Sequence, residues 1–226
     1  MQRIFLIDLL RFIAIVSMVA FHVVYDLAVF YGYSIDYERG FWQVLQMVFA
    51  GGLFIFVSGW TASIGRRSWT NLLHIGFAAM LVSLVTYFQF GNMYVRFGVL
   101  HLLFTANLLY ILILHILSTR VLFLLALLLS IIIKPLTKIV VAHEYFVWLD
   151  ILPIGYQSVD HYPVLPWLIV FIIGVIWGRL ETKAFTNSFE PAAQWAAWIT
   201  KCSKNSLVIY LLHQPVILLI LYLVLQ

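Results

Sequence analysis

The chain has 226 residues, of which 64% are hydrophobic and only 10% are charged. Because a soluble globular protein is nearer half apolar and a quarter charged, this chain has too little polar surface to stay folded in water. Its formal net charge of +4 comes from 13 scattered basic residues, and its single cysteine cannot close an intramolecular disulfide. The composition therefore excludes a disordered chain, a nucleic-acid binder and a disulfide scaffold, and it predicts a polytopic integral membrane protein.

The N-terminus is basic and then apolar, as a secretory signal is. It lacks a small-residue cleavage site, however, and Asp8 and Arg11 lie inside the apolar stretch, so we expect a retained first helix. A bilayer core needs about 20 mostly apolar residues per helix. Such runs predict a single all-α transmembrane domain over residues 1–226, a bundle of about seven helices: residues 4–30, 41–64, 70–90, 94–117, 120–141, 164–180 and 206–225.

Two segments depart from this regular pattern. Lys134-Pro135 lies within the fifth predicted helix and is expected to end it early. The segment 142–163 is too polar to span a membrane and too aromatic for a flexible linker, so we expect it to lie in the interface or to fold back into the bundle. It offers three aromatic platforms on which a sugar can stack: Trp148, Tyr156 and Tyr162.

The Lys and Arg residues near the helix ends predict the orientation, because cytoplasmic loops carry an excess of basic residues. One side of the membrane receives eight of these residues and the other receives four. This places the N-terminus in the cytoplasm and, with seven spans, the C-terminus outside. The larger set is Arg3, Arg66, Arg67, Arg120, Arg179, Lys183, Lys201 and Lys204, and the smaller set is Arg39, Arg96, Lys134 and Lys138.

The first helix carries polar side chains that are costly inside a membrane and therefore indicate function. Asp8, Arg11, His22 and Asp26 form one stripe, within roughly 60° of one another at about 100° per residue. Arg11 and His22 are about 16 Å apart along the helix axis, so Arg11 lies near the cytoplasmic boundary and His22 lies past the midplane. Asp26 follows His22 at i+4, where it can hold the imidazole in one tautomer. Asp8 and Arg11 can equally neutralise each other.

The last predicted helix carries a second stripe, formed by Ser206, Tyr210 and His213 and followed by Gln214-Pro215. A proline within a span frees a backbone carbonyl, which is tolerated where a cavity or a packing partner compensates. The stripe is a candidate part of a site, or it is interhelical hydrogen bonding that holds the bundle together.

Two further segments contain polar or small residues within predicted spans. The fourth contributes Arg96, His101 and Asn107. The second contains AGGLFIFVSGW, whose glycines and serine permit close helix approach, which favours packing over chemistry: Gly51, Gly52, Ser58 and Gly59.

These motifs resemble those of a transmembrane acyl transferase superfamily. Arg11, an apolar decad and His22 fit the R-x10-H pattern of the acyltransferase-3 family, and LFIFVSGW (53–60) is similar to its FFxxSGF segment. The whole set resembles bacterial relatives of the heparan-α-glucosaminide N-acetyltransferase catalytic domain. The stretches that carry the likeness are DLLRFIAIVSMVAFHVVYDL (8–27), RFGVLHLLF (96–104), LPWLIVFIIGVIWG (165–178) and NSLVIYLLHQPVIL (205–218).

The resemblance implies an enzyme of the bacterial inner (plasma) membrane that moves an acetyl group from cytoplasmic acetyl-CoA to an extracytoplasmic acceptor, without a metal. The acceptor that it implies is a hydroxyl or amine of a sugar, either in a glycan or in a lipid-linked sugar. His22, oriented by Asp26, is the candidate general base or acyl-accepting nucleophile, and Tyr210, His213 or Ser206 is a candidate oxyanion donor. Residues expected to bind CoA are Arg11, Asp8, Arg66, Arg67, Arg96 and His101.

Two features depart from the families. The animal enzyme has an asparagine where His22 stands, and its histidine in the following loop has no counterpart in residues 31–41. The chain also has fewer predicted spans, so a second copy, in a homodimer, is one way to complete the acceptor vestibule.

Two other function classes stay open. A stripe of Asp, Arg, His and Asp also suits a proton-coupled transporter or flippase, although no inverted repeat supports it. A catalytically silent scaffold subunit is the third reading, and it leaves four buried charges on one helix unexplained.

Overall fold

The computed structural model describes residues 4–65, 68–181 and 194–225, and these residues form two compact units. The terminal unit combines the two ends of the chain, Met1–Val57 and Lys183–Gln226. The central unit is Ser58–Thr182, so the boundary falls inside one helix, α3 (Leu53–Ile64). The described residues contain helices and two isolated β-bridges but no strand, which confirms the predicted all-α class.

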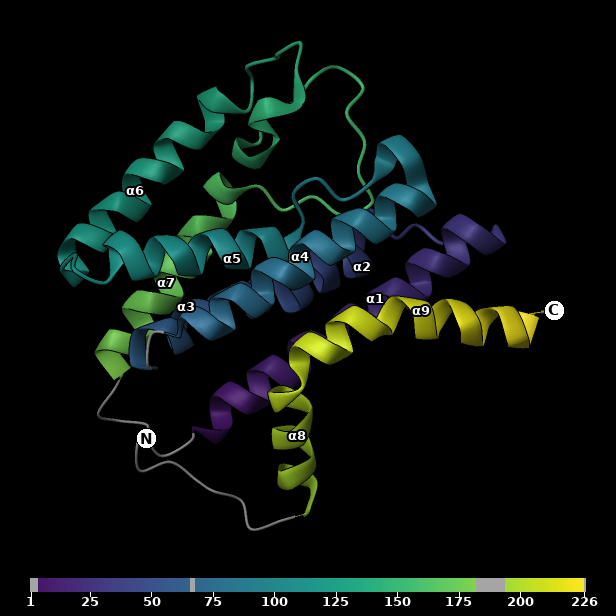
Figure 1. Ribbon diagram of the computed structural model, residues 1–226, viewed down its shortest axis with the longest axis horizontal. Helices are drawn as coiled ribbons and strands as arrows, with labels where there is room; N and C mark the ends of the chain where they lie inside the picture. Colours follow the sequence, from purple (N-terminus) through teal and green to yellow (C-terminus); the bar gives the residue numbers. More distant parts are fainter. Residues whose placement is uncertain (1–3, 66–67, 182–193, 226) are drawn as a thin grey trace. The chain divides into compact units, whose positions relative to one another are not determined.

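In the terminal unit, the long helix α1 contacts three other elements (Figure 1). α1 (Phe5–Tyr31) ends at Gly32, whose φ of 73° closes the helix in the left-handed region. A π-helix, η1 (Leu45–Gly52), follows the short helix α2 (Gly40–Val44) and packs along α1. α8 (Gln194–Lys204) and α9 (Ser206–Leu225) also contact α1.

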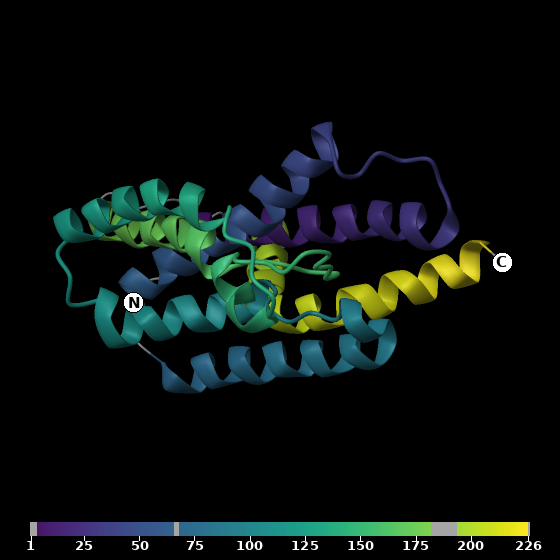
Figure 2. The ribbon, with the colours of Figure 1, turned by 90° about the horizontal axis from the view of Figure 1, so that it is seen from above.

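In the central unit, α4 lies beside α5, and α7 packs against both α5 and α6 (Figure 2). The bounds of its helices are α4 Trp69–Phe90, η2 Gly91–Met93, α5 Val99–Leu109, η3 Tyr110–Leu114, α6 Thr119–Leu136, η4 Glu144–Leu149 and α7 Val164–Glu181. The hydroxyls of Ser68 and Ser118 accept backbone N–H bonds at the starts of α4 and α6. As expected, α6 ends just after Pro135.

The small residues of the second predicted span serve packing, as the sequence indicated. A Cβ added at Gly59 would lie 2.0 Å from the backbone oxygen of Phe171, so α3 and α7 approach as closely as two backbones can. The hydroxyl of Ser58 accepts a hydrogen bond from the amide of Asn107 at 3.0 Å, which ties α3 to α5.

Six helices of the described chain are long and apolar enough to cross a membrane, and the fourth predicted span is shorter than the rest. It runs over Val99–Leu114, about 24 Å against a hydrocarbon core of about 30 Å. Its direction is nevertheless that expected of a helix that returns across the membrane after α4. Residues Gly76 and Ser83 of α4 meet Phe104 and His101, so α4 and α5 run antiparallel along their length.

The relative direction of α1 and α9 also bears on whether Val99–Leu114 crosses the membrane. Asp8 bonds with Ser203, just before α9, whereas further along α1 the Asp26 side chain bonds with Gln214. The partner numbers rise together, so α1 and α9 run parallel, and an odd number of crossings must separate them. Four of the long helices lie between α1 and α9. The structure thus shows six long apolar helices among the described residues, and a crossing by Val99–Leu114 would supply the odd number that the prediction of about seven spans requires.

The structure shows local structure in two segments for which the sequence predicted none. α8 was not predicted at all. The segment 142–163 contains η4 and two chain bridges, Phe97 with His161 and Val141 with Pro153. Of its three expected platforms, Tyr162 is buried against Trp167 and is not available for stacking, whereas Trp148 is 42% exposed.

Candidate functional site

The polar stripe of α1 divides into two clusters, one toward each end of the helix. Near the N-terminal end, the buried carboxylate of Asp8 accepts hydrogen bonds from the hydroxyls of Ser203 at 2.7 Å and Thr200 at 3.3 Å. The Arg11 guanidinium donates to the same Ser203 oxygen at 3.2 Å. Asp8 and Arg11 thus meet at α8, a contact that the sequence did not suggest.

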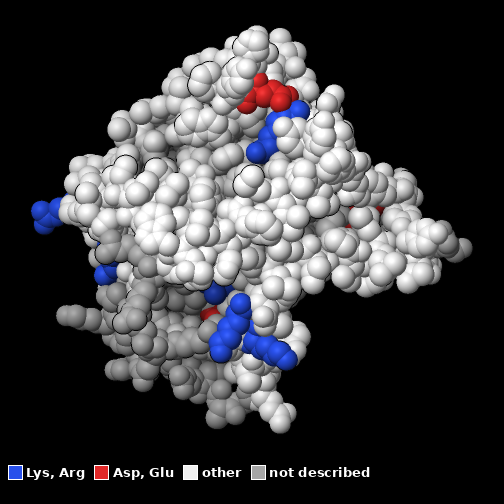
Figure 3. All heavy atoms as spheres, in the orientation of Figure 1, with Lys and Arg blue, Asp and Glu red and all other residues white. Residues whose placement is uncertain are grey.

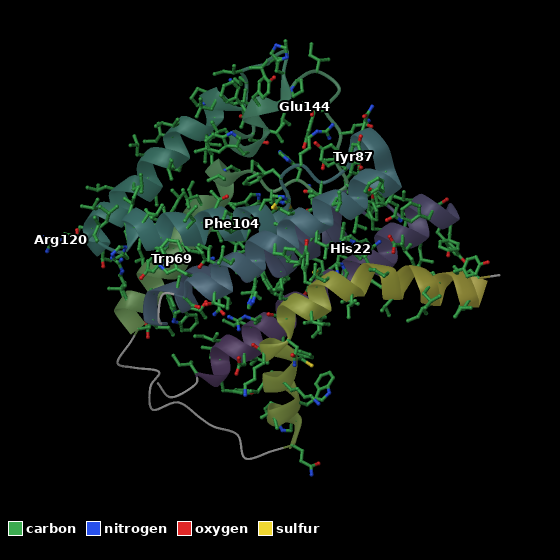
Figure 4. The ribbon with its side chains drawn as sticks, viewed as in Figure 1. His22, Trp69, Tyr87, Phe104, Arg120 and Glu144 are labelled. Atoms are coloured by element: carbon green, nitrogen blue, oxygen red, sulfur yellow. The ribbon has the colours of Figure 1, made fainter. Side chains whose placement is uncertain are left out.

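The second cluster lies where the C-terminal half of α1 passes α9, and His22 is labelled there in Figure 4. The rings of His22 and His213 lie with their centroids 4.8 Å apart. One turn further along α1, the Asp26 side chain is fully buried, and its two carboxylate oxygens accept from the Gln214 amide nitrogen at 2.7 and 2.9 Å. The structure therefore brings the predicted catalytic residues of α1, His22 and Asp26, together with His213 and its neighbour Gln214 of α9.

The prediction that Asp26 orients the His22 imidazole is wrong. Although the i+4 spacing puts both side chains on one face of α1, the structure pairs Asp26 with Gln214 of α9, and no hydrogen bond joins the described side chains of His22 and Asp26. A long amide that reaches across from a facing helix competes with the neighbour on the same helix, and only the fold determines which of them is within reach.

The ring whose tautomer is fixed is instead that of His213. Its Nδ1 lies against the backbone oxygen of Tyr210, and because a carbonyl only accepts, Nδ1 carries the proton. Nε2 of the neutral ring is then an unprotonated acceptor, so it cannot serve as the oxyanion donor that the sequence suggested for His213. Tyr210, the fourth predicted catalytic residue, lies beside it, with ring centroids 5.5 Å apart.

Three buried polar atoms of this cluster have no hydrogen-bond partner among the described residues: His22 Nδ1, His213 Nε2 and Gln214 Oε1. The orientation of the Gln214 amide follows from Asp26, since an ionised carboxylate accepts only and must face the NH₂ group. Each unpaired buried group costs about 1–3 kcal/mol. A ligand with hydrogen-bond donors would remove that cost.

Arg96 does not offer a free cation for CoA. It forms an ion pair with Glu144, donates to the backbone oxygen of Asn92 at 2.7 Å, and lies over the rings of Tyr94 and Tyr156 at 4.4 and 5.4 Å. Glu144 is labelled in Figure 4. These contacts fasten the segment after α4 to the segment 142–163.

His101 has a structural role in the central unit. Its Nδ1 accepts the N–H of Gly98 at 3.3 Å, so its Nε2 carries the proton and donates to Ser83 Oγ at 3.1 Å, and that hydroxyl in turn donates to the Val95 oxygen. Both ring nitrogens are occupied within the protein. The two remaining residues expected to bind CoA, Arg66 and Arg67, lie outside the described residues.

The sequence analysis missed a second His–carboxylate pair and a helix cap in the segment 142–163. His161 Nε2 lies 3.0 Å from Asp150 Oδ1. Asp160 accepts the Val99 N–H at 3.1 Å and so caps α5 from outside the helix. Burial raises the pKa of Asp160 to about 6, although the bond from Val99 and the nearby His161 oppose the shift.

Comparison with protein families shows to which family the chain belongs. A family described as heparan-alpha-glucosaminide N-acetyltransferase, catalytic, matches residues 3–215, nearly the whole chain. The chain belongs to this family. The match spans both clusters of α1 and extends through Gln214, so the residues described above lie within the heparan-α-glucosaminide N-acetyltransferase catalytic domain.

Membership of the heparan-α-glucosaminide N-acetyltransferase family implies transmembrane acetyltransferase activity, and the apolar helices agree with an integral membrane protein. No curated protein and no solved structure matches the chain. The described residues contain no group of three or more His, Cys, Asp or Glu side chains able to hold a metal ion.

Proposed function

We propose that the chain transfers an acetyl group from cytoplasmic acetyl-CoA to an extracytoplasmic sugar hydroxyl or amine, and that the cluster of His22, His213, Asp26 and Gln214 is where transfer occurs. The observation that carries the proposal is the pair of adjacent imidazoles, 4.8 Å between ring centroids, with unpaired buried nitrogens inside two parallel spans. Acyl transfer from a thioester needs a base within hydrogen-bond reach of the proton on the incoming hydroxyl or amine.

In this mechanism His213 Nε2 is the general base. It takes the proton from the incoming hydroxyl or amine as that atom attacks the thioester carbonyl and forms the new bond to carbon. The carbon–sulfur bond then breaks, and the imidazolium returns the proton to the CoA sulfur. The Tyr210 carbonyl, which accepts from Nδ1, supports the positive charge on the ring while it holds the proton.

His22 and Gln214 complete the site in different ways. The His22 ring lies directly beside the base and is suited to meet the acyl group or its developing oxyanion. Gln214 Oε1, fixed by Asp26, offers an acceptor for a second donor on the acetyl acceptor, such as a neighbouring sugar hydroxyl. Tyr210 and Ser206 are the remaining candidates for oxyanion donors.

The path for the donor follows α1. α1 is a continuous helix over Phe5–Tyr31, so Arg11 lies about 16 Å from His22 along the axis, comparable to an extended pantetheine arm. In this proposal the phosphates of CoA bind basic side chains at the cytoplasmic face, for which Arg11, Arg66 and Arg67 are the candidates, while the thioester reaches His22. Asp8, which is buried and bonded to Ser203, contributes by holding α8 against α1 rather than by touching phosphate.

The experiment uses the purified full chain in nanodiscs with acetyl-CoA as donor and glucosamine as probe acceptor. We expect saturable acetyl-CoA binding and glucosamine-dependent release of free CoA, measured by thiol titration. Vesicles that acidify in response to a solute gradient without acetyl-CoA, together with no acetyl-CoA binding, would favour the transporter instead.

A further inference from the structure

α8 has three distinct faces, although it has only 11 residues. With about 3.6 residues per turn, these faces are roughly 120° apart around the helix. The first is buried: Ala196, Ile199 and Ser203 are each at most 8% exposed, and α8 contacts α1. The bonds of Ser203 with Asp8 and Arg11 lie on this face and fix α8 to the N-terminal part of α1.

The second face is aromatic and exposed. Trp195 is 53% exposed and Trp198 is 59% exposed, and both lie edge-on to rings of α1, Phe5 at 5.7 Å and Phe12 at 5.3 Å. The third face carries Lys201 and Lys204, which are both exposed. Figure 3 shows basic side chains gathered where α8 lies in the terminal unit.

The chain connectivity places α8 at the membrane boundary. α8 ends at Lys204 and the spanning helix α9 begins at Ser206, with one residue between them. α8 itself is about 16 Å long, too short to cross a core of about 30 Å, and Figure 1 shows it turned away from the direction of α9. It lies beside the start of α1, the end that we predict to be cytoplasmic.

We propose that α8 is an interfacial helix whose Lys201 and Lys204 bind the phosphate groups of anionic phospholipids in the leaflet where α1 begins. A tryptophan face beside a lysine face is the pattern of helices that lie in the plane of a membrane, with tryptophan toward the acyl chains and lysine toward the headgroups. Anionic headgroups of the cytoplasmic leaflet match the two positive charges. The proposal does not depend on acetyl transfer.

The chain's only cysteine provides a depth gauge for this arrangement. Cys202 lies between Trp195 and Trp198 around the helix, so a nitroxide attached to it should collide with oxygen, which concentrates among acyl chains, and be protected from a water-soluble nickel chelate. A nitroxide at Lys204→Cys in a Cys202→Ser background should show the reverse. Equal exposure of both labels to the nickel chelate would overturn the interfacial placement.

Lipid selectivity tests the lysines directly. The full chain is placed in nanodiscs of phosphatidylcholine with phosphatidylglycerol as the minor component, and bound lipids are counted by native mass spectrometry. We expect K201Q/K204Q to lose enrichment of phosphatidylglycerol by about fivefold per lysine, since one cation near the surface is worth about 1 kcal/mol. The matched control is K134Q/K138Q, two exposed lysines at the end of α6, which should retain the enrichment.

Two results would contradict the proposal. One is unchanged phosphatidylglycerol enrichment in K201Q/K204Q. The other is displacement of the bound phosphatidylglycerol by acetyl-CoA together with weaker acetyl-CoA binding in K201Q/K204Q, because this would assign the lysines to the phosphates of CoA. Persistence of the lipid at saturating acetyl-CoA supports the lipid assignment.

Discussion

The pairing of Asp26 with Gln214 has a consequence for stability. Removing one partner leaves the other buried and unpaired, which costs about 1–3 kcal/mol, whereas replacing both with apolar groups can be nearly neutral. We therefore expect Gln214→Leu to lower the midpoint of thermal unfolding in detergent, and Asp26→Leu/Gln214→Leu to recover most of the loss. If the double variant is destabilised by the sum of the two single effects, the two side chains do not interact as described.

Asp160 predicts a pH dependence with a definite sign. Its pKa is raised in the folded protein, from an ordinary value of 3.8 to about 6. The folded state therefore favours the neutral acid, and the stability that this provides is complete below about pH 4 and is lost as the pH rises through about 6. Asp160→Asn keeps an oxygen to accept the Val99 N–H without the charge.

The stability of Asp160→Asn relative to the original chain should therefore grow between pH 4 and pH 7, toward about 3 kcal/mol. Chemical unfolding in detergent at several pH values measures this difference. The control is Asp36→Asn, which removes an exposed carboxylate from the loop after α1. If the difference in unfolding free energy between Asp160→Asn and the original chain is constant across that range, folding does not raise the pKa of Asp160, and the prediction is wrong.

At the scale of elements, the contact between α3 and α7 predicts unequal effects of two similar substitutions. Gly59→Ala puts a Cβ 2.0 Å from the Phe171 backbone oxygen, whereas Gly76→Ala puts one 2.9 Å from the flexible Phe104 ring. Both glycines lie inside helices, so the gain in helix propensity is the same. Gly59→Ala should destabilise by about 1–3 kcal/mol or more, and Gly76→Ala by much less, as measured by thermal unfolding.

The long spans were predictable because bilayer thickness imposes a length and a composition that a single sequence displays. α8 was not predictable, because its 11 residues of mixed Trp, Ala and Lys are too few and too polar to indicate a span. Its role becomes visible only through its contacts with α1. Val99–Leu114 was predicted as a span, but with bounds that were too long, because the apolar run continues past the helix into loops that Arg96 and Arg179 hold in place.

The candidate site was predictable in its residue types but not in its pairs. Histidines and carboxylates deep within apolar helices are easily recognised in a sequence, because such residues are rare there and indicate function. Which of these side chains contact one another depends on the register between α1 and α9. From the sequence alone, the expected partner of His22 was Asp26, which is close to it on the same helix. The structure instead fixes the His213 ring through Tyr210 and pairs Asp26 with Gln214.

At the scale of the whole molecule, an odd number of crossings between α1 and α9 predicts which loops share a side. Single cysteines at Ser34, Ser68 and Ser118 in a Cys202→Ser background report this with an impermeant thiol reagent on intact cells. If Val99–Leu114 crosses, Ser118 is on the same side as Ser68 and opposite Ser34. With the N-terminus in the cytoplasm, Ser34 alone reacts from outside.

Labelling of Ser118 together with Ser34 would mean that Val99–Leu114 does not cross. Labelling of Ser68 from outside would reverse the orientation and would place α8 in the outer leaflet.

The central claim is that His213 and His22 perform acetyl transfer, and replacing each with alanine tests it most directly. The control is His115→Ala, because the Nδ1 of His115 also lies 3.1 Å from a tyrosine carbonyl oxygen, that of Tyr110, but outside the cluster. The measurement is glucosamine-dependent CoA release alongside acetyl-CoA affinity. Loss of a general base costs about 10²–10⁴ in rate, and loss of a group that meets the developing oxyanion costs about 10²–10³. His213→Ala and His22→Ala should therefore lose transfer and keep acetyl-CoA affinity, while His115→Ala keeps both. Full turnover in His213→Ala and His22→Ala would contradict the account.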